Sequence, residues 1–163
     1  MGVRDVIKRW TGKGPEQVDS EQADAGTVVA GFVEAIGDHD LDRAFALVAA
    51  DAEVAIPPVG VTGDAAQARE FFRATLAAFP DLTVRVRRTV VTPDGTVAVE
   101  TTLEGTQAGD YLGIVNQEKH LDVDGSWLFR VRDGRIRTVH GYWCQNQVYR
   151  RLAVKRIDQP AIV

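Results

Sequence analysis

The sequence predicts an α+β fold, with three helices laid across one face of a curved, mostly antiparallel sheet. Two observations carry this prediction. Up to Pro80, apolar residues recur with the helical period of about 3.6 residues, and from Asp81 onward they alternate with the strand period of two. Helices followed by a run of antiparallel strands are typical of this class.

The first helix is predicted to begin near residue 25 and to end at Gly37, because glycine is favoured directly after a helix. Its apolar stripe consists of Ala25, Val28, Val29, Phe32, Val33 and Ile36. Residues 1–24 stand apart, with four apolar residues at helical spacing and then the polar segment GKGPEQVDSEQAD. We interpret them as a leader with a short helix, or as an arm that docks on a partner subunit or caps the domain.

Capping residues mark the next two helices. Asp40 is placed to cap the second, and Asp64 with Gln67 forms a capping box for the third. Pro80 ends the third helix, because proline has no amide to donate and clashes with the preceding turn. The remaining strands are predicted at residues 53–56, 82–91, 96–106, 118–132 and 135–149.

Composition and charge indicate which broad class of protein the chain belongs to. The chain has 163 residues, 45% of them hydrophobic and 26% charged, as expected for one soluble domain. A net charge of −4 argues against nucleic-acid binding, and no apolar run is long enough to cross a membrane. The single cysteine excludes an internal disulfide, and no Cys/His cluster has zinc spacing. Without a signal-peptide pattern in its first residues, the chain is expected to be cytoplasmic.

Three segments carry a family resemblance. The stretch GFVEAIGDHDLDRAFALVAADAEVAIPPVGVTGDAAQAREFF, the loop LEGTQAGDYLGI and the hairpin WLFRVRDGRIRTVHGYW together resemble SnoaL-like polyketide cyclases. The resemblance extends to a superfamily that includes ketosteroid isomerase, limonene epoxide hydrolase and nuclear transport factor two. It implies a cone-shaped α+β barrel over residues 25–152, enclosing a mostly apolar cavity, and a tail at residues 153–163. It also implies a homodimer that uses neither a metal nor an organic cofactor.

The carboxylates of the isomerase are missing from this chain. By resemblance, the position of its aspartate base reads Pro57, and its second, protonated aspartate falls at Trp127. Many cyclases of the family have Trp-Asp where this chain has Trp143-Cys144. Acid–base residues therefore cannot be transferred here by position.

The Asp133-Gly134 turn allows two hairpin registers. A two-residue loop pairs Trp127 with His140, whereas a three-residue loop pairs Trp127 with Val139. The second is favoured, because it places the apolar residues of both strands together. It predicts that Trp127 contacts Val139 or Gly141, that His140 lies on the opposite face, and that Gly125 and Gly141 leave room for a flat ligand between two tryptophans.

The candidate site follows from this arrangement. His140 and Asp110 are the candidate proton-transfer residues, although a hydrogen-bonded histidine on the outer face and an aspartate in a turn are the more common roles for such residues. The candidate ligand-binding residues are Trp127, Trp143, Phe32, Tyr111, Val139 and Gly141.

We therefore expect a small cofactor-independent cyclase, isomerase or dehydratase that acts on a hydrophobic polycyclic or polyketide-derived molecule. The alternative is a non-catalytic protein of the same fold that binds a small ligand or a partner. A homodimer is expected through the outer face of the sheet, which the helices leave uncovered. That face is predicted to carry Tyr142, with Leu128 and Ile136 as apolar members.

Overall fold

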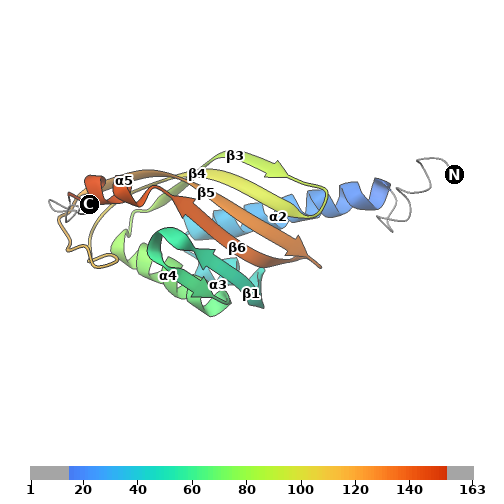
Figure 1. Ribbon diagram of the computed structural model, residues 1–163, viewed down its shortest axis with the longest axis horizontal. Coiled ribbons are helices and arrows are strands. Elements are labelled where there is room, and N and C mark those ends of the chain that lie inside the picture. The colour runs from blue at the N-terminus through green and yellow to red at the C-terminus, as the bar shows by residue number, and fades with distance from the viewer. Residues whose placement is uncertain (1–14, 154–163) are drawn as a thin grey trace, which may run out of the picture.

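The computed structural model describes residues 15–153, with side chains from residue 24 onward. Within this range, four α-helices accompany one six-stranded sheet (Figure 1). The helices are α2 (Pro15–Gly37), α3 (Leu41–Ala46), α4 (Ala65–Ala78) and α5 (Gln145–Arg151), and a short 3-10 helix, η1, spans Pro57–Val59. The α+β prediction is confirmed.

Helix α2 is longer than the apolar stripe indicates. It begins at Pro15, a residue whose fixed φ suits the first helical position, and it extends past the body of the domain (Figure 1). The polar segment predicted as part of a leader is thus helical from residue 15 onward. The stripe itself packs as predicted, with Ala25, Val29 and Phe32 buried against the sheet. The short helix expected within residues 1–10 lies outside the described residues.

The predicted caps are present. The side chain of Asp40 accepts a hydrogen bond from the Arg43 amide at 2.9 Å. Asp64 accepts one from the Ala66 amide at 2.8 Å, and the Gln67 side chain accepts one from the Asp64 amide at 2.9 Å. These bonds satisfy amides that the first turn of each helix leaves free.

The sheet has the strand order β2-β1-β6-β5-β4-β3. All neighbouring strands are antiparallel except β1 and β6, which are parallel. The sheet does not close into a complete barrel, because β2 and β3 remain as its two edges. The strands are β1 (Val48–Ile56), β2 (Val61–Gly63), β3 (Thr83–Val91), β4 (Thr96–Thr106), β5 (His120–Arg132) and β6 (Arg135–Trp143).

The β5–β6 hairpin differs from both predicted registers. Asp133 and Gly134 form a two-residue loop, both with positive φ, and a bulge at Arg137 then shifts the pairing by one residue. Trp127 consequently pairs with Gly141, two residues from the pairing we favoured. Because side chains alternate between the two faces of a strand, a register shift of two residues leaves each side chain on the face predicted for it. The predicted contact of Trp127 with Gly141 is therefore confirmed. His140 lies on the opposite face of the sheet, as predicted.

The bulge also corrects one prediction for the outer face. Ile136 was expected there, but it is completely buried in the core. The extra residue at Arg137 lets Ile136 and Val139, three positions apart, both point toward the helices.

The last predicted strand is too long. Strand β6 ends at Trp143, and residues Gln145–Arg151 form helix α5, on which Val148 is buried. Val148 and the following Leu152 are four residues apart and both buried, as expected for one face of a helix. Helix α5 thus covers one end of the layer between helices and sheet (Figure 1).

Two apolar clusters fill this layer. In the larger, the Phe32 ring makes edge contacts with Phe45, Phe72 and Phe129 at centroid distances of 5.6–5.8 Å. The smaller gathers around Phe79, Tyr111 and other residues near α5. Trp143 packs against both clusters, so the region where they meet lies beneath it.

Candidate functional site

An interior cavity lies where the two clusters meet. It consists of two adjacent spaces of about 40 Å³ and 20 Å³, which share Ile36, Phe72, Leu103 and Trp127 as lining residues. Helices α2 and α4 form one wall, and the inner face of the sheet forms the other. These volumes hold a few water molecules at most, so a larger ligand requires side chains at the cavity to move.

Aromatic rings from α4 and the sheet form much of the wall. Phe71 stacks on Trp143 at 5.9 Å with an interplanar angle of 24°, and Phe72 lies 5.5 Å from Trp127 at 32°. The two tryptophans are 5.9 Å apart and tilted by 37°. Flat apolar surfaces of this kind favour a planar, hydrophobic ligand.

Trp143 is the half-buried member of this wall. Its indole N–H donates to the Gln145 side chain at 2.8 Å, at the start of α5. Val148 of α5 lines the same 40 Å³ space. A movement of Trp143 with α5 would therefore enlarge the cavity toward solvent.

Tyr111 and Thr75 supply hydroxyl groups to the 40 Å³ space, and their oxygens are 3.1 Å apart. Thr75 donates its proton to the carbonyl of Phe71 at 2.8 Å, so the Tyr111 O–H donates to Thr75. The phenol oxygen keeps lone pairs for a ligand donor, and the O–H reaches a ligand carbonyl if it turns away from Thr75. Burial raises the pKa of Tyr111 to about 12, although the bond with Thr75 opposes the shift.

The Tyr111 ring is held in place by its own loop. Tyr111 and Ile114 exchange two backbone hydrogen bonds of 2.8 and 2.9 Å. The ring meets the edge of Phe79 at 5.1 Å and 81°. Only 6% of the residue is exposed, so the ring is buried within the domain.

Among the described residues that line the two spaces, none is an aspartate, glutamate, histidine, lysine or arginine. Threonine, tyrosine and tryptophan supply the polar side-chain atoms. The cavity can therefore orient a ligand and donate or accept hydrogen bonds, but its wall holds no strong general base.

The structure places the two candidate proton-transfer residues away from this cavity. Asp110 is exposed, and its carboxylate accepts a hydrogen bond from the Asn116 amide at 2.8 Å, as a turn residue does. His140 lies on the outer face of the sheet, with Nε2 3.8 Å from Glu53 Oε1. Neither residue lines the cavity, and their catalytic roles stay predictions without geometric support.

The candidate ligand-binding residues divide into two groups. Phe32, Trp127, Trp143 and Tyr111 all line the cavity. Val139 is fully buried in the larger cluster and lines neither space. Gly141 does not leave room for a ligand, because the Trp127 indole occupies that room: a Cβ there would lie 2.6 Å from its ring.

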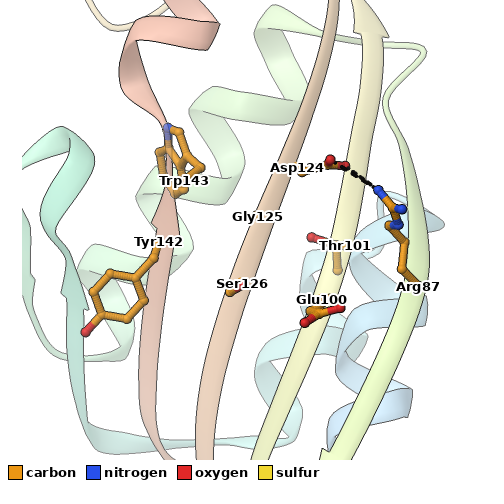
Figure 2. A pocket seen from close by; sticks show the side chains of 8 residues that line it. All are labelled: Arg87, Glu100, Thr101, Asp124, Gly125, Ser126, Tyr142 and Trp143. Atoms are coloured by element: carbon orange, nitrogen blue, oxygen red, sulfur yellow. Dashed lines mark hydrogen bonds and ion pairs between the residues drawn. The ribbon is translucent and has the colours of Figure 1, made fainter.

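An open trough of about 510 Å³ lies on the outer face of the sheet (Figure 2). Its lining includes Tyr142 and the ion pair of Arg87 with Asp124, at 3.1 Å, and it also reaches Thr101 and Gly125. A hydrogen bond from Thr102 and the nearby arginine lower the pKa of Asp124. Within the described part of the chain, no group of three or more His, Cys, Asp or Glu side chains could hold a metal ion, here or elsewhere.

Comparison with known families agrees with this architecture. The family model described as SnoaL-like polyketide cyclase matches residues 27–152. The chain belongs to this family. No curated protein matches this SnoaL-like chain, and no helix within residues 15–153 is long and apolar enough to span a membrane.

Solved structures share the SnoaL-like fold. IdmH from Streptomyces antibioticus, a candidate polyketide cyclase, is 26% identical over 79% of this chain and 98% of its own, with a TM-score of 0.70. AclR from Streptomyces galilaeus, a candidate hydroxylase, is 20% identical over 82% and 98% of the two chains, with a TM-score of 0.73. A candidate SnoaL-like cyclase from Jannaschia sp. CCS1 is 21% identical over 86% and 96%, with a TM-score of 0.73.

Sequence reasoning did not identify Thr75 or Thr101 as cavity residues. A signal for Thr101 exists in β4, where Val97, Val99, Thr101 and Leu103 share one face by alternation. A threonine in an otherwise apolar row faces the core with a hydroxyl group. Thr75 carries no comparable signal, because a helical threonine often bonds to its own backbone, as this one does.

Proposed function

We propose that this chain is a cofactor-independent cyclase or isomerase that acts on a planar, hydrophobic, polyketide-derived molecule in the interior cavity. The observation that carries the proposal is the aromatic wall of Phe71, Phe72, Trp127 and Trp143, with the Tyr111–Thr75 hydroxyl pair beside it. Membership of the SnoaL-like family and the likeness to IdmH support this class of substrate.

The cavity would act mainly by holding the substrate. Rings on both walls restrict a flexible chain to folded conformations, which lowers the entropic part of the barrier. A hydrogen bond from Tyr111 to a carbonyl oxygen would stabilise the enolate that forms when a carbon between two carbonyls loses its proton. Hydroxide from solvent can take this proton, so the step needs no carboxylate in the wall. The enolate carbon would then attack a second carbonyl carbon of the chain, whose C=O π electrons move to oxygen, and that alkoxide would take a proton from water.

Turnover is the decisive test. The purified protein is incubated with a linear β-polycarbonyl thioester, and cyclised product is measured by liquid chromatography and mass spectrometry against a protein-free reaction. We expect faster or more selective cyclisation with the wild type, and a partial loss of this effect in Tyr111→Phe, which keeps the walls of the cavity and lacks the hydrogen bond to the enolate. Product formation equal to that of the protein-free reaction would contradict an enzymatic role.

A second function is favoured by one specific observation. The described lining of the cavity contains no carboxylate or histidine, as expected if the protein binds its ligand without changing it. Tight binding of the thioester, with no change in product, would support this alternative.

We also propose that the chain forms a homodimer through the outer face of the sheet. Tyr142 and Leu128 are 41% and 38% exposed on this face, and Tyr142 lines the open trough (Figure 2). Exposed apolar side chains among polar ones are typical of a partly wet interface.

A further inference from the structure

Thr101 carries a buried hydroxyl group that has no protein partner. The residue is 2% exposed on the inner face of β4, and its Oγ1 makes no hydrogen bond to any residue of the described range. A buried hydroxyl without a partner lowers stability, and such groups are few in folded proteins. A valine at position 101 would have nearly the same shape, and without a hydroxyl group it would not lower stability in this way.

Gly125 pairs directly with Thr101 across β4 and β5 (Figure 2). A Cβ at residue 125 would lie 3.8 Å from Thr101 Oγ1 and 3.7 Å from Trp127 Nε1. The only nearer atom is the Tyr142 carbonyl oxygen, at 3.3 Å. Three polar atoms thus face this position: Thr101 Oγ1 and Trp127 Nε1, which can donate hydrogen bonds, and the Tyr142 carbonyl oxygen, which can only accept them.

Both groups also belong to the cavity wall. Thr101 and Trp127 line the 20 Å³ space, next to the 40 Å³ space that holds the Tyr111–Thr75 pair. Gly125 lines neither of these spaces; together with Thr101 it lines the open trough, so the Thr101 hydroxyl lies between the trough and the cavity. An indole N–H can only donate, whereas a hydroxyl donates or accepts. A ligand group that satisfies both must therefore accept the indole hydrogen bond, and the carbonyl oxygen of a planar ketone is such an acceptor.

We propose that Thr101 and Trp127 bind a carbonyl oxygen of the ligand against Gly125, and so select planar ketones and quinones over hydrocarbons of the same shape. The inference rests on the proposed function, because Thr101 and Trp127 line the proposed cavity. It adds a second polar contact at the sheet, distinct from Tyr111 near α5. Two separated contacts would fix which way round a flat molecule lies.

Two probes of nearly equal shape test the carbonyl contact. 9-Fluorenone has one ketone oxygen, and fluorene has none. Their affinities for the wild type, Thr101→Val and Thr101→Ser are measured by equilibrium dialysis. We expect the wild type to bind fluorenone at least about tenfold more tightly than fluorene, for two hydrogen bonds to one oxygen.

The variants separate the contribution of the Thr101 hydroxyl to binding from that of the other cavity residues. Thr101→Val should reduce the preference for fluorenone by about threefold to tenfold, with fluorene affinity unchanged, and should melt at or above the wild-type temperature. Thr101→Ser keeps a hydroxyl and should keep most of the preference. Gly125→Ala should reduce fluorenone binding as well, by filling the oxygen position.

Each outcome decides a different point. Equal binding of both probes by the wild type would overturn the carbonyl contact and leave the proposed cavity in place. An unchanged preference in Thr101→Val would overturn it too. Binding of neither probe would contradict the cavity as a site for planar ligands, and the carbonyl contact with it.

Discussion

The indole ring of Trp127 lies directly against the backbone of Gly141, its cross-strand partner. A Cβ added to Gly141 would come within 2.6 Å of Cζ3 and within 3.0 Å of two further ring atoms. The glycine therefore lets the tryptophan lie flat on the sheet, with Phe72 against it at 5.5 Å. This contact sets the position of the ring that forms the sheet side of the cavity.

Gly141→Ala should destabilise the protein. The methyl group would displace the Trp127 ring from a packed core, and such overpacking costs about 1–3 kcal/mol. Gly109→Ala is the matched control, because the nearest atom to its Cβ is 3.8 Å away and its φ is not positive. Urea unfolding measures both, and equal stabilities of the two variants would contradict this packing.

The contact also predicts a compensating double variant. In a Trp127→Leu background, the smaller side chain leaves space for the methyl group. The added cost of Gly141→Ala should then fall below about 0.5 kcal/mol, which a double-mutant cycle measures. A cost as large as that in the wild type would locate the clash elsewhere.

Tyr111→Phe should change how stability depends on alkaline pH. The folded protein holds the phenol proton up to a pKa of about 12, whereas the unfolded chain releases it near 10.0. Wild-type stability therefore falls relative to Tyr111→Phe as pH rises from 10 to 12, by about 2 kcal/mol. Urea unfolding of both proteins between pH 8 and 11.5 checks this, and parallel curves would mean that Tyr111 is not buried in solution.

Asp94 should give stability that is lost in acid. Hydrogen bonds from Thr92 and Thr96, with Arg130 nearby, lower its pKa from 3.8 to about 2, despite some desolvation. The carboxylate therefore stabilises the fold above pH 4, and this contribution disappears as pH falls toward 2. Asp94→Asn should be the less stable protein at pH 7, and the difference should shrink from pH 4 to 2.5. A difference independent of pH would show that the charge is not responsible.

Tyr142→Glu should weaken the proposed homodimer. The substitution places like charges near a two-fold contact on the outer face and leaves the buried core untouched. Val115→Glu adds the same charge on an exposed loop residue and is the control. Light scattering at micromolar concentration should give a dimer for the wild type and for Val115→Glu, and a monomer for Tyr142→Glu. A wild type of about 18 kDa would contradict the proposal.

The fold was largely predictable because its signals are local. Capping residues at Asp40 and Asp64 and alternating apolar residues each depend on a few neighbouring positions. The hairpin register was harder, because the bulge at Arg137 has no glycine or proline to mark it. The faces of Trp127 and His140 were still correct, since the error was an even number of residues.

The site was less predictable than the fold. Aromatic residues on an inner face indicate a core, and the sequence does not show how much space remains between them. Gly141 illustrates this: the space left by its missing side chain is filled by the Trp127 ring and is not available to a ligand. Thr101 shows the converse: its strand position predicts burial, but the absence of a hydrogen-bond partner is visible only in three dimensions.

The central claim is that planar ligands bind in the interior cavity, and a crystal structure of the protein with 9-fluorenone tests it most directly. We predict electron density for the probe between α4 and the inner face of the sheet, in contact with Trp127 and Trp143, with Trp143 shifted from its stacked position on Phe71. Density for the probe only in the outer trough beside Tyr142, with the interior unchanged, would contradict the claim.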